Sequence, residues 1–172
     1  MQLFRNAMAV AMLAAAAVPA PQARAASVVS NAAGACQGSL PIYNANLRKR
    51  PLGILNEGAT SAFLSCGLQW GVMPGNTPQT YVTATNRNAT AVDLTCTLLD
   101  GYPIVTGEPF ARVYYHPKTI SIAADSTASI VWDPSDYYVG AHTFTGYENF
   151  SCNVPAGVEI NRAGYDYDYA PS

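Results

Sequence analysis

Charged residues are scarce in this sequence of 172 residues. Lys and Arg together number 9 and Asp and Glu 11, so charged residues make up 12% of the chain and the formal net charge is −2. Non-specific binding to nucleic acid depends on clustered Lys and Arg at phosphates. The only such cluster is Arg48-Lys49-Arg50, which we interpret as a solvated loop. We therefore predict no nucleic-acid partner.

Histidine and established catalytic motifs are also scarce. His116 and His142 are the only histidines, and thus the only candidates for an imidazole base near neutral pH. The sequence contains no Gly-x-Ser-x-Gly elbow, no His-Glu-x-x-His motif and no glycine loop of the phosphate-binding kind. These absences disfavour the common hydrolases, metalloproteases and nucleotide-dependent enzymes. We predict no cofactor.

Long apolar runs are missing after the first residues of the chain. The run Ala7 to Val18 is about a dozen residues, shorter than the roughly 20 that span a bilayer. Arg5 before it and Ala23-Arg24-Ala25 after it fit a secretory signal with its cleavage site. We predict that residues 1–25 are a signal peptide and that 26–172 form one secreted or periplasmic domain without a membrane span.

Closely spaced cysteines are absent as well. Zinc sites usually contain C-x2-C or H-x3-H pairs, so we predict no metal site. Four cysteines in an oxidising compartment are most simply two disulfides, and three pairings are possible. We favour Cys36 with Cys66 and Cys96 with Cys152, because the second pair joins two regularly patterned strands.

No segment after the signal shows a sustained helical period, and the sequence shows no internal repeat. Val92 to Leu98 instead alternates apolar and polar residues without a break, so Val92, Leu94, Cys96 and Leu98 share one face. Similar strands recur with Gly, Pro and Asn between them, which predicts an all-β fold: a single disulfide-stapled antiparallel β-sandwich, or an irregular barrel.

The pattern also gives expectations about strand pairing. We expect Tyr81 to Thr85 to form an antiparallel hairpin with the Val92 strand, and Tyr147 to Val154 to form one with Val158 to Tyr169. We expect Pro117 to end the strand before it, because proline cannot donate to a sheet ladder.

Several features occur together in one order along the chain. They are an early cysteine, a Gly-x-x-Asn strand, a polar-alternating cysteine strand, a closing Pro-Ala-Gly turn and an acidic end: Cys36, Gly53 to Asn56, Ala62 to Cys66, Cys96, Phe150 to Gly157 and Ile160-Asn161. In this order the sequence resembles a loosely defined group of small exported bacterial proteins of unknown function, and the resemblance implies no activity or site. In place of a Cys-Pro that the group often has, this chain has Cys66-Gly67.

One segment admits either a helix start or a catalytic site. In Asp133-Pro134-Ser135-Asp136, the first residue suits an N-cap, Pro134 the first helical position and Asp136 the first turn. The same carboxylates could act as an acid/base pair, with His142 nearby in sequence. This is the basis of an alternative function, a small secreted hydrolase using Asp133, Asp136 and His142.

Tyrosine is unusually frequent, with 11 residues in the chain. Tyr165, Tyr167 and Tyr169 alternate with Asp166 and Asp168, which predicts an exposed aromatic row on one strand face. Such a row, together with Tyr137 and Tyr138, could stack on sugar rings. Our first hypothesis is therefore a non-catalytic exported domain that binds an envelope or extracellular glycan. A third is an inhibitor that presents Arg48 to Pro51 to a protease.

Overall fold

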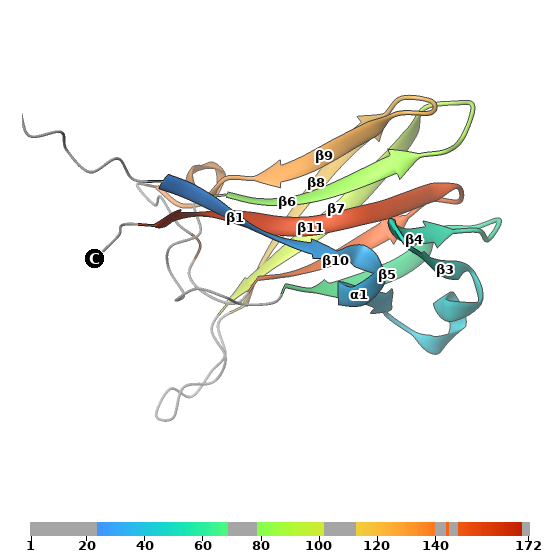
Figure 1. Ribbon diagram of the computed structural model, residues 1–172, viewed down its shortest axis with the longest axis horizontal. Coiled ribbons are helices and arrows are strands. Elements are labelled where there is room, and N and C mark those ends of the chain that lie inside the picture. The colour runs from blue at the N-terminus through green and yellow to red at the C-terminus, as the bar shows by residue number, and fades with distance from the viewer. Residues whose placement is uncertain (1–23, 69–78, 102–112, 140–143, 145–147, 170–172) are drawn as a thin grey trace, which may run out of the picture.

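A computed structural model describes residues 24–68, 79–101, 113–139, 144 and 148–169. Within these ranges the chain forms two antiparallel β-sheets packed face to face (Figure 1), which confirms the predicted all-β sandwich. Most of the predicted signal peptide, residues 1–23, lies outside the described residues, and the first strand begins at Arg24. No helix in the described part of the chain is long and apolar enough to cross a membrane.

The strands are divided between a six-stranded and a five-stranded sheet. The six-stranded sheet has the order β3-β4-β11-β6-β9, with β1 also pairing with β11: β1 (Arg24–Asn31), β3 (Leu47–Arg50), β4 (Gly53–Asn56), β6 (Gln79–Asn86), β9 (Thr127–Trp132) and β11 (Val158–Tyr169). The five-stranded sheet has the order β2-β5-β10-β7-β8: β2 (Cys36–Gly38), β5 (Ala62–Gly67), β7 (Val92–Gly101), β8 (Val113–Ile122) and β10 (Asn149–Val154). Short helices are α1 (Ala32–Ala35), η1 (Pro41–Ala45) and η2 (Pro134–Asp136).

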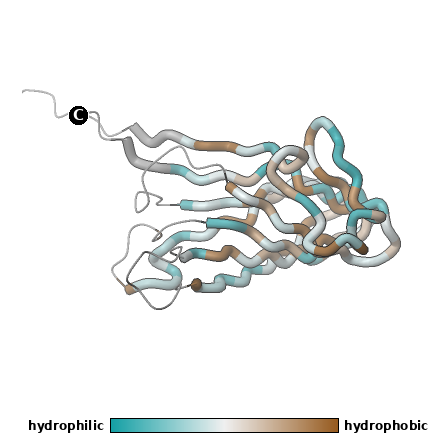
Figure 2. Tube along the Cα trace, turned by 90° about the horizontal axis from the view of Figure 1, so that it is seen from below, coloured by the Kyte–Doolittle hydropathy of each residue, from teal (hydrophilic) through white to brown (hydrophobic). Residues whose placement is uncertain are grey.

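The core lies between the two sheets and follows the alternation in the sequence. In β7, Leu94, Cys96 and Leu98 are fully buried, while Thr95 and Thr97 between them are partly exposed. Brown and teal alternate along the strands in Figure 2 for the same reason. Trp132 of β9 packs on Phe150 of β10, with ring centroids 5.3 Å apart, so an aromatic contact joins the sheets.

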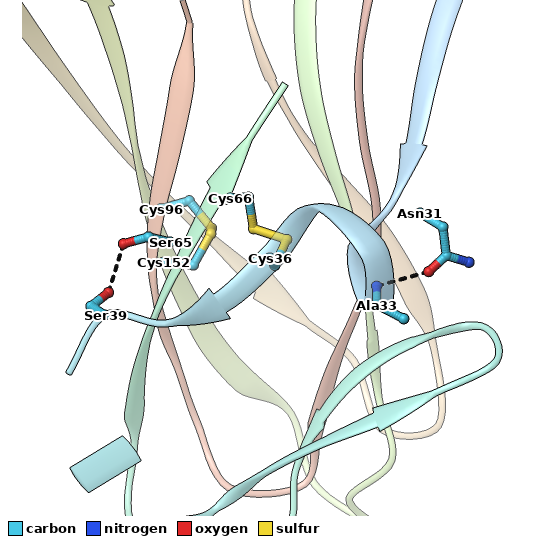
Figure 3. The surroundings of a disulfide bond; sticks show 8 residues. All are labelled: Asn31, Ala33, Cys36, Ser39, Ser65, Cys66, Cys96 and Cys152. Atoms are coloured by element: carbon cyan, nitrogen blue, oxygen red, sulfur yellow. Dashed lines mark hydrogen bonds between the residues drawn. A yellow bond between two sulfur atoms is a disulfide. The ribbon is translucent and has the colours of Figure 1, made fainter. Parts of the chain in front are cut away.

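Both disulfides have the pairing that we favoured, Cys36 with Cys66 and Cys96 with Cys152. In each pair the cysteines are direct partners on adjacent strands of the five-stranded sheet. The two crosslinks lie close together beneath that sheet (Figure 3). They tie β2 to β5 and β7 to β10, and leave the packing of one sheet on the other to the apolar core.

The expected hairpins are wrong, because the two strands of each expected hairpin belong to different sheets. β6 pairs with β9 and β11, whereas β7 pairs with β8 and β10. β10 and β11 are separated in the same way. The apolar faces of β6 and β7 meet across the core from opposite sides, so the connection must cross between the layers rather than fold back within one sheet. Four of the connections that cross between the sheets, which we call the arches, join β4 to β5, β6 to β7, β8 to β9 and β10 to β11.

The arches lie at the same end of the sandwich, on the right in Figure 1, and are hydrogen-bonded to one another. Gly157 N donates to Asn56 O at 2.8 Å and Arg87 N donates to Gly157 O at 3.0 Å. Asn86 N donates to Ser126 O at 2.8 Å. This continuous series of bonds fixes the relative position of the two sheets at that end.

Two of the arches share a motif that the sequence pattern did not reveal. Asn56 and Asn86 are both fully buried, and each side-chain amide donates to the carbonyl oxygen four residues on, Thr60 or Thr90. The segments 56–66 and 86–96 are related by an offset of 86 − 56 = 30 residues and share Asn, Ala, Thr, Leu and Cys at equivalent positions. A buried asparagine therefore supplies hydrogen bonds that the turning backbone lacks.

Replacing Asn86 with alanine is expected to lower the free energy of unfolding by about 3 kcal/mol. Its amide also reaches Ile122 O at 3.1 Å and Ala123 O at 3.0 Å, and these buried carbonyls would lose their donor. Denaturant titration measures the loss. The exposed Asn149→Ala variant is the control, and we expect it to change stability by less than about 0.5 kcal/mol. Equal effects for the two variants would show that Asn86 does not hold its arch.

Two further expectations about strand boundaries are also wrong. β8 continues through Pro117, because β8 is the edge strand beyond β7, where a strand tolerates proline. Arg48-Lys49-Arg50 lies in the edge strand β3 and not in a loop, and both Arg48 and Arg50 pair with Glu57. Charged residues on an edge strand discourage pairing with other chains, which explains the cluster without a ligand.

Candidate functional site

The predicted tyrosine row on β11 is not an exposed surface at Tyr165, whose side chain is fully buried. The reason is a register shift in the pairing of β11 with β6 between Ile160 and Arg162. Before the shift Val158 and Ile160 face the core, and after it Ala163 and Tyr165 do. Tyr167 and Tyr169 lie in β11, but their side chains are outside the described residues.

Tyr137 and Tyr138 follow η2 and turn toward the end of β7 and β8. The Tyr137 ring lies 4.2 Å from the His116 ring, measured between centroids. The Tyr138 hydroxyl donates to Asp100 Oδ2 at 2.9 Å and lies 2.9 Å from His116 Nε2. Because that hydroxyl has one proton, His116 Nε2–H is the donor to Tyr138. Both tyrosines are half-buried against the core.

Asp100, His116, Tyr138 and Glu148 form what we call the end cluster. Glu148 is fully buried, and neither of its carboxyl oxygens has a hydrogen-bond partner in the structure as described. Burial, and secondarily the charge of Asp100, raises the pKa of Glu148 to about 8. Burial also lowers the pKa of His116, which Asp100 opposes. At neutral pH Glu148 therefore retains its proton next to Asp100.

The end cluster carries the chemical groups of an acid/base site but lacks access. Asp100 and Glu148 are 0% exposed and His116 is 7% exposed. A general acid must reach the proton acceptor of its substrate within hydrogen-bonding distance. Within the described ranges the cluster is a buried network at the end of the sheet, and sequence reasoning missed it because its members come from four separate segments.

The proposed catalytic trio of Asp133, Asp136 and His142 is only partly described. Asp133 Oδ1 accepts from Ser135 N at 2.9 Å and from Ser135 Oγ at 2.6 Å, and η2 begins at Pro134, which confirms the helix-start interpretation. Asp136 forms an ion pair with Lys118, and its Oδ2 lies 3.3 Å from Lys118 Nζ. His142 lies outside the described residues. No group of three or more metal-ligating side chains is found in the part of the chain that the structure describes.

A different surface combines exposed aromatic rings with a hollow. On the outer face of the five-stranded sheet, a depression of about 450 Å³, which we call the aromatic groove, is lined by polar hydroxyls and apolar side chains. Phe63 is 44% exposed and Tyr115 is 66% exposed, both large values for aromatic residues on strands. The described lining residues are Ser39, Leu40, Tyr43, Phe63, Ser65, Thr97, Leu99, Tyr115 and Ser151.

Strand register places the hydroxyls of the groove side by side. Ser65 of β5 is the direct partner of Ser151 of β10, which is in turn the partner of Thr97 of β7. Each is an outward position between buried neighbours, as period-2 alternation requires. Adjacent strands lie about 4.8 Å apart, so the three hydroxyls form a closely spaced row.

Aromatic side chains stand on both sides of this hydroxyl row. Tyr43 of η1 packs against Phe63 with ring centroids 5.9 Å apart. Ser39 Oγ lies 2.7 Å from Ser65 Oγ (Figure 3), and this hydrogen bond holds the segment leading to η1 on β5. On the other side, Tyr115 of the edge strand β8 is the direct partner of Leu99.

The aromatic groove has no charged side chain among its described lining residues. Such a surface suits a neutral ligand with apolar faces and many hydroxyl groups, since an ionic ligand would find no partner for its charge. One signal in the sequence could have indicated it. Phe63 is the apolar residue that breaks the alternation of β5, and its side chain therefore points outward from the sheet.

No protein-family model matches this sequence, and no curated protein matches it. Among solved structures, the chain is similar to CBM35 from Paenibacillus barcinonensis, with 11% identity and a TM-score of 0.37 over 84% of this chain and 99% of that one. It is also similar to a family 16 carbohydrate-binding module, with 9% identity and a TM-score of 0.34 over 67% and 72% of the two chains. A third similar structure is TmCBM61 in complex with β-1,4-galactotriose, with 10% identity and a TM-score of 0.32 over 83% and 84%.

Proposed function

We propose that this protein is an exported, non-catalytic domain that binds an uncharged glycan in the aromatic groove. The observation that supports the proposal is the combination, in one surface hollow, of exposed Phe63 and Tyr115 rings with the Ser65, Ser151 and Thr97 hydroxyl row. The contact surface differs from the tyrosine row suggested by the sequence.

The chemistry of the groove fits sugars for two reasons. The C–H faces of a pyranose ring are apolar and pack on aromatic rings, which provide large contact areas at little cost in side-chain entropy. Sugar hydroxyls both donate and accept hydrogen bonds, as serine and threonine hydroxyls do. Because neither partner is ionised, no charge has to be desolvated on binding.

The proposed location follows from the covalent structure and from the first residues of the chain. Two disulfides are typical of oxidising compartments outside the cytosol. The predicted signal peptide at residues 1–25 and the resemblance to small exported bacterial proteins agree with that placement. We therefore propose a secreted or periplasmic protein that contacts a cell-envelope or extracellular glycan.

Removing the aromatic rings is the direct test. We expect Phe63→Ala and Tyr115→Ala each to weaken binding at least about tenfold, and the double variant to abolish retention. The measurement is depletion of the full mature protein from solution by insoluble cellulose, chitin, mannan, xylan and galactan.

Tyr114→Ala provides a matched control on the same strand. Tyr114 is 39% exposed but faces the end cluster, where its ring meets Tyr138 with centroids 5.8 Å apart. We expect this variant to bind as the wild type does. Absence of binding to every polysaccharide, or equal losses for Tyr114→Ala and Tyr115→Ala, would contradict the proposal.

A further inference from the structure

The aromatic groove continues into two neighbouring hollows of about 380 Å³ and 600 Å³. Ser65, Leu99 and Ser151 line both the groove and the 380 Å³ hollow, which we call the middle hollow. Gly34 and Gly67 line both the middle hollow and the 600 Å³ hollow, which we call the far hollow. Because the middle hollow shares lining residues with each of the other two, the three lie in a row, and we call this row the trough.

The trough runs across the five-stranded sheet and past its edge. It begins at Phe63 and Tyr115, crosses β10 and β5, passes the Cys36–Cys66 crosslink and α1, and ends against Val29 to Asn31 of β1. Its far end therefore lies on a strand of the opposite sheet.

The trough is longer than one sugar ring. Phe63 on β5 and Tyr115 on β8 are separated by three inter-strand steps, or about 14 Å at about 4.8 Å a step, before the other two hollows are counted. Polar groups for hydrogen bonding continue beyond the groove, since Gln37 and Asn149 line the middle hollow and Ser30 and Asn31 the far one. A monosaccharide would occupy only one of these positions.

The charge of the trough restricts the polymer that it accepts. Among the described lining residues of the three hollows, the one charged side chain is Lys49, in the middle hollow. No carboxylate lines the trough in that part of the chain. A cationic polysaccharide would therefore meet a like charge at Lys49 and gain no ion pair. A polyanionic one would find a single cation for its repeated charges, and none in the aromatic groove or the far hollow, whereas a neutral polymer needs no ion pair.

We infer that the trough binds an internal segment of a linear, uncharged polysaccharide, with consecutive sugar units in the aromatic groove, the middle hollow and the far hollow. This inference rests on the proposed function and goes beyond it, because a glycan could bind in the aromatic groove alone. Affinity should then rise with ligand length until the trough is filled.

A glycine offers a way to block the trough without removing any contact. Gly34 lines both the middle and the far hollow, and a Cβ added there would meet no atom within 4 Å. Gly34→Trp therefore fills the trough with an indole, while Gly34→Ala leaves it open. Gly67→Trp is a second blocking variant at the same junction, since its Cβ would lie 3.7 Å from Asn149 Oδ1, an ordinary contact.

The experiment is calorimetric titration of the mature protein with β-1,4-linked gluco-, manno-, xylo- and galacto-oligosaccharides, from disaccharide to hexasaccharide, and with chitosan as the cationic polymer. For the series that binds, we expect the hexasaccharide to bind at least about tenfold more tightly than the disaccharide. Gly34→Trp and Gly67→Trp should remove this gain and leave disaccharide binding unchanged. Gly34→Ala, which adds a single methyl group, should keep more of this gain than Gly34→Trp does, and chitosan should not bind.

The outcomes separate the inference from the proposed function. If affinity does not depend on length, or if neither tryptophan variant affects the hexasaccharide, the inference fails, and the proposed function survives provided that Phe63→Ala still weakens binding. If no sugar of any length binds, both fail. Thermal unfolding of each variant verifies that it is folded. If Gly34→Trp does not fold, Gly67→Trp serves as the test in its place.

Discussion

Between pH 4.5 and pH 8, Glu148 is expected to reduce the free energy of unfolding by about 4 kcal/mol, and Glu148→Gln to remove that decrease. The pKa of Glu148 is raised from 4.5 to about 8 by burial and by Asp100. Over this pH range the folded state holds a proton that the unfolded state has lost. Stability is therefore highest below the unfolded pKa and falls as the pH rises through the folded one.

The measurement is urea unfolding of wild type and variant at several pH values. Since all other titrating groups are common to both proteins, the difference between their pH profiles isolates Glu148. Asp100→Asn is the matched control. It removes the charge of Asp100, the smaller of the two causes that raise the pKa of Glu148. We therefore expect the stability of this variant still to fall with rising pH, but by less than that of the wild type. Parallel profiles for wild type and Glu148→Gln would show that Glu148 is not buried as described.

Removing the Cys96–Cys152 disulfide is expected to lower the free energy of unfolding by about 4 kcal/mol on the chain-entropy model. The bonded cysteines are 56 residues apart, so the crosslink closes a long loop in the unfolded chain. Both sulfurs are fully buried beneath the five-stranded sheet, and Cys96→Ala with Cys152→Ala also leaves a small void there.

The other disulfide provides a comparison within the same sheet. Cys36 and Cys66 are 30 residues apart and join the edge strand β2 to β5. Because this loop is shorter, replacing both cysteines with alanine should lower the free energy of unfolding somewhat less, by about 3.5 kcal/mol. Denaturant unfolding of the non-reduced proteins measures both losses. Unchanged stability in the Cys96 and Cys152 variant, or four free thiols in the wild type by mass spectrometry, would contradict the pairing.

Local alternation in the sequence was enough to predict the class of fold and both disulfides. Val92 to Leu98 places Cys96 on an apolar face, and Phe150 to Val154 does the same for Cys152, so the two cysteines were expected to meet in a core. The partner of each strand could not be predicted in this way. A pattern of period two shows which face is buried but not whether the next strand lies beside it or across the core.

The candidate site required information that the sequence pattern does not contain. The register shift after Ile160 reverses which face of β11 is buried, and a single-residue shift of this kind has no compositional signal here. The aromatic groove brings together η1, β5, β10, β7 and β8. Its hydroxyl row therefore cannot be recognised until the order of these strands is known. Phe63, on the polar face of its strand, was the one local clue.

The most direct test of the account is to map the binding surface residue by residue. The ¹⁵N-labelled mature protein is titrated with whichever of soluble xylan, mannan or galactan it retains, and backbone amide shifts are recorded. We predict the largest shifts at Ser65, Thr97 and Ser151 on the outer face of the five-stranded sheet. Shifts confined to the end cluster, to the six-stranded sheet or to no residue at all would contradict glycan binding in the aromatic groove.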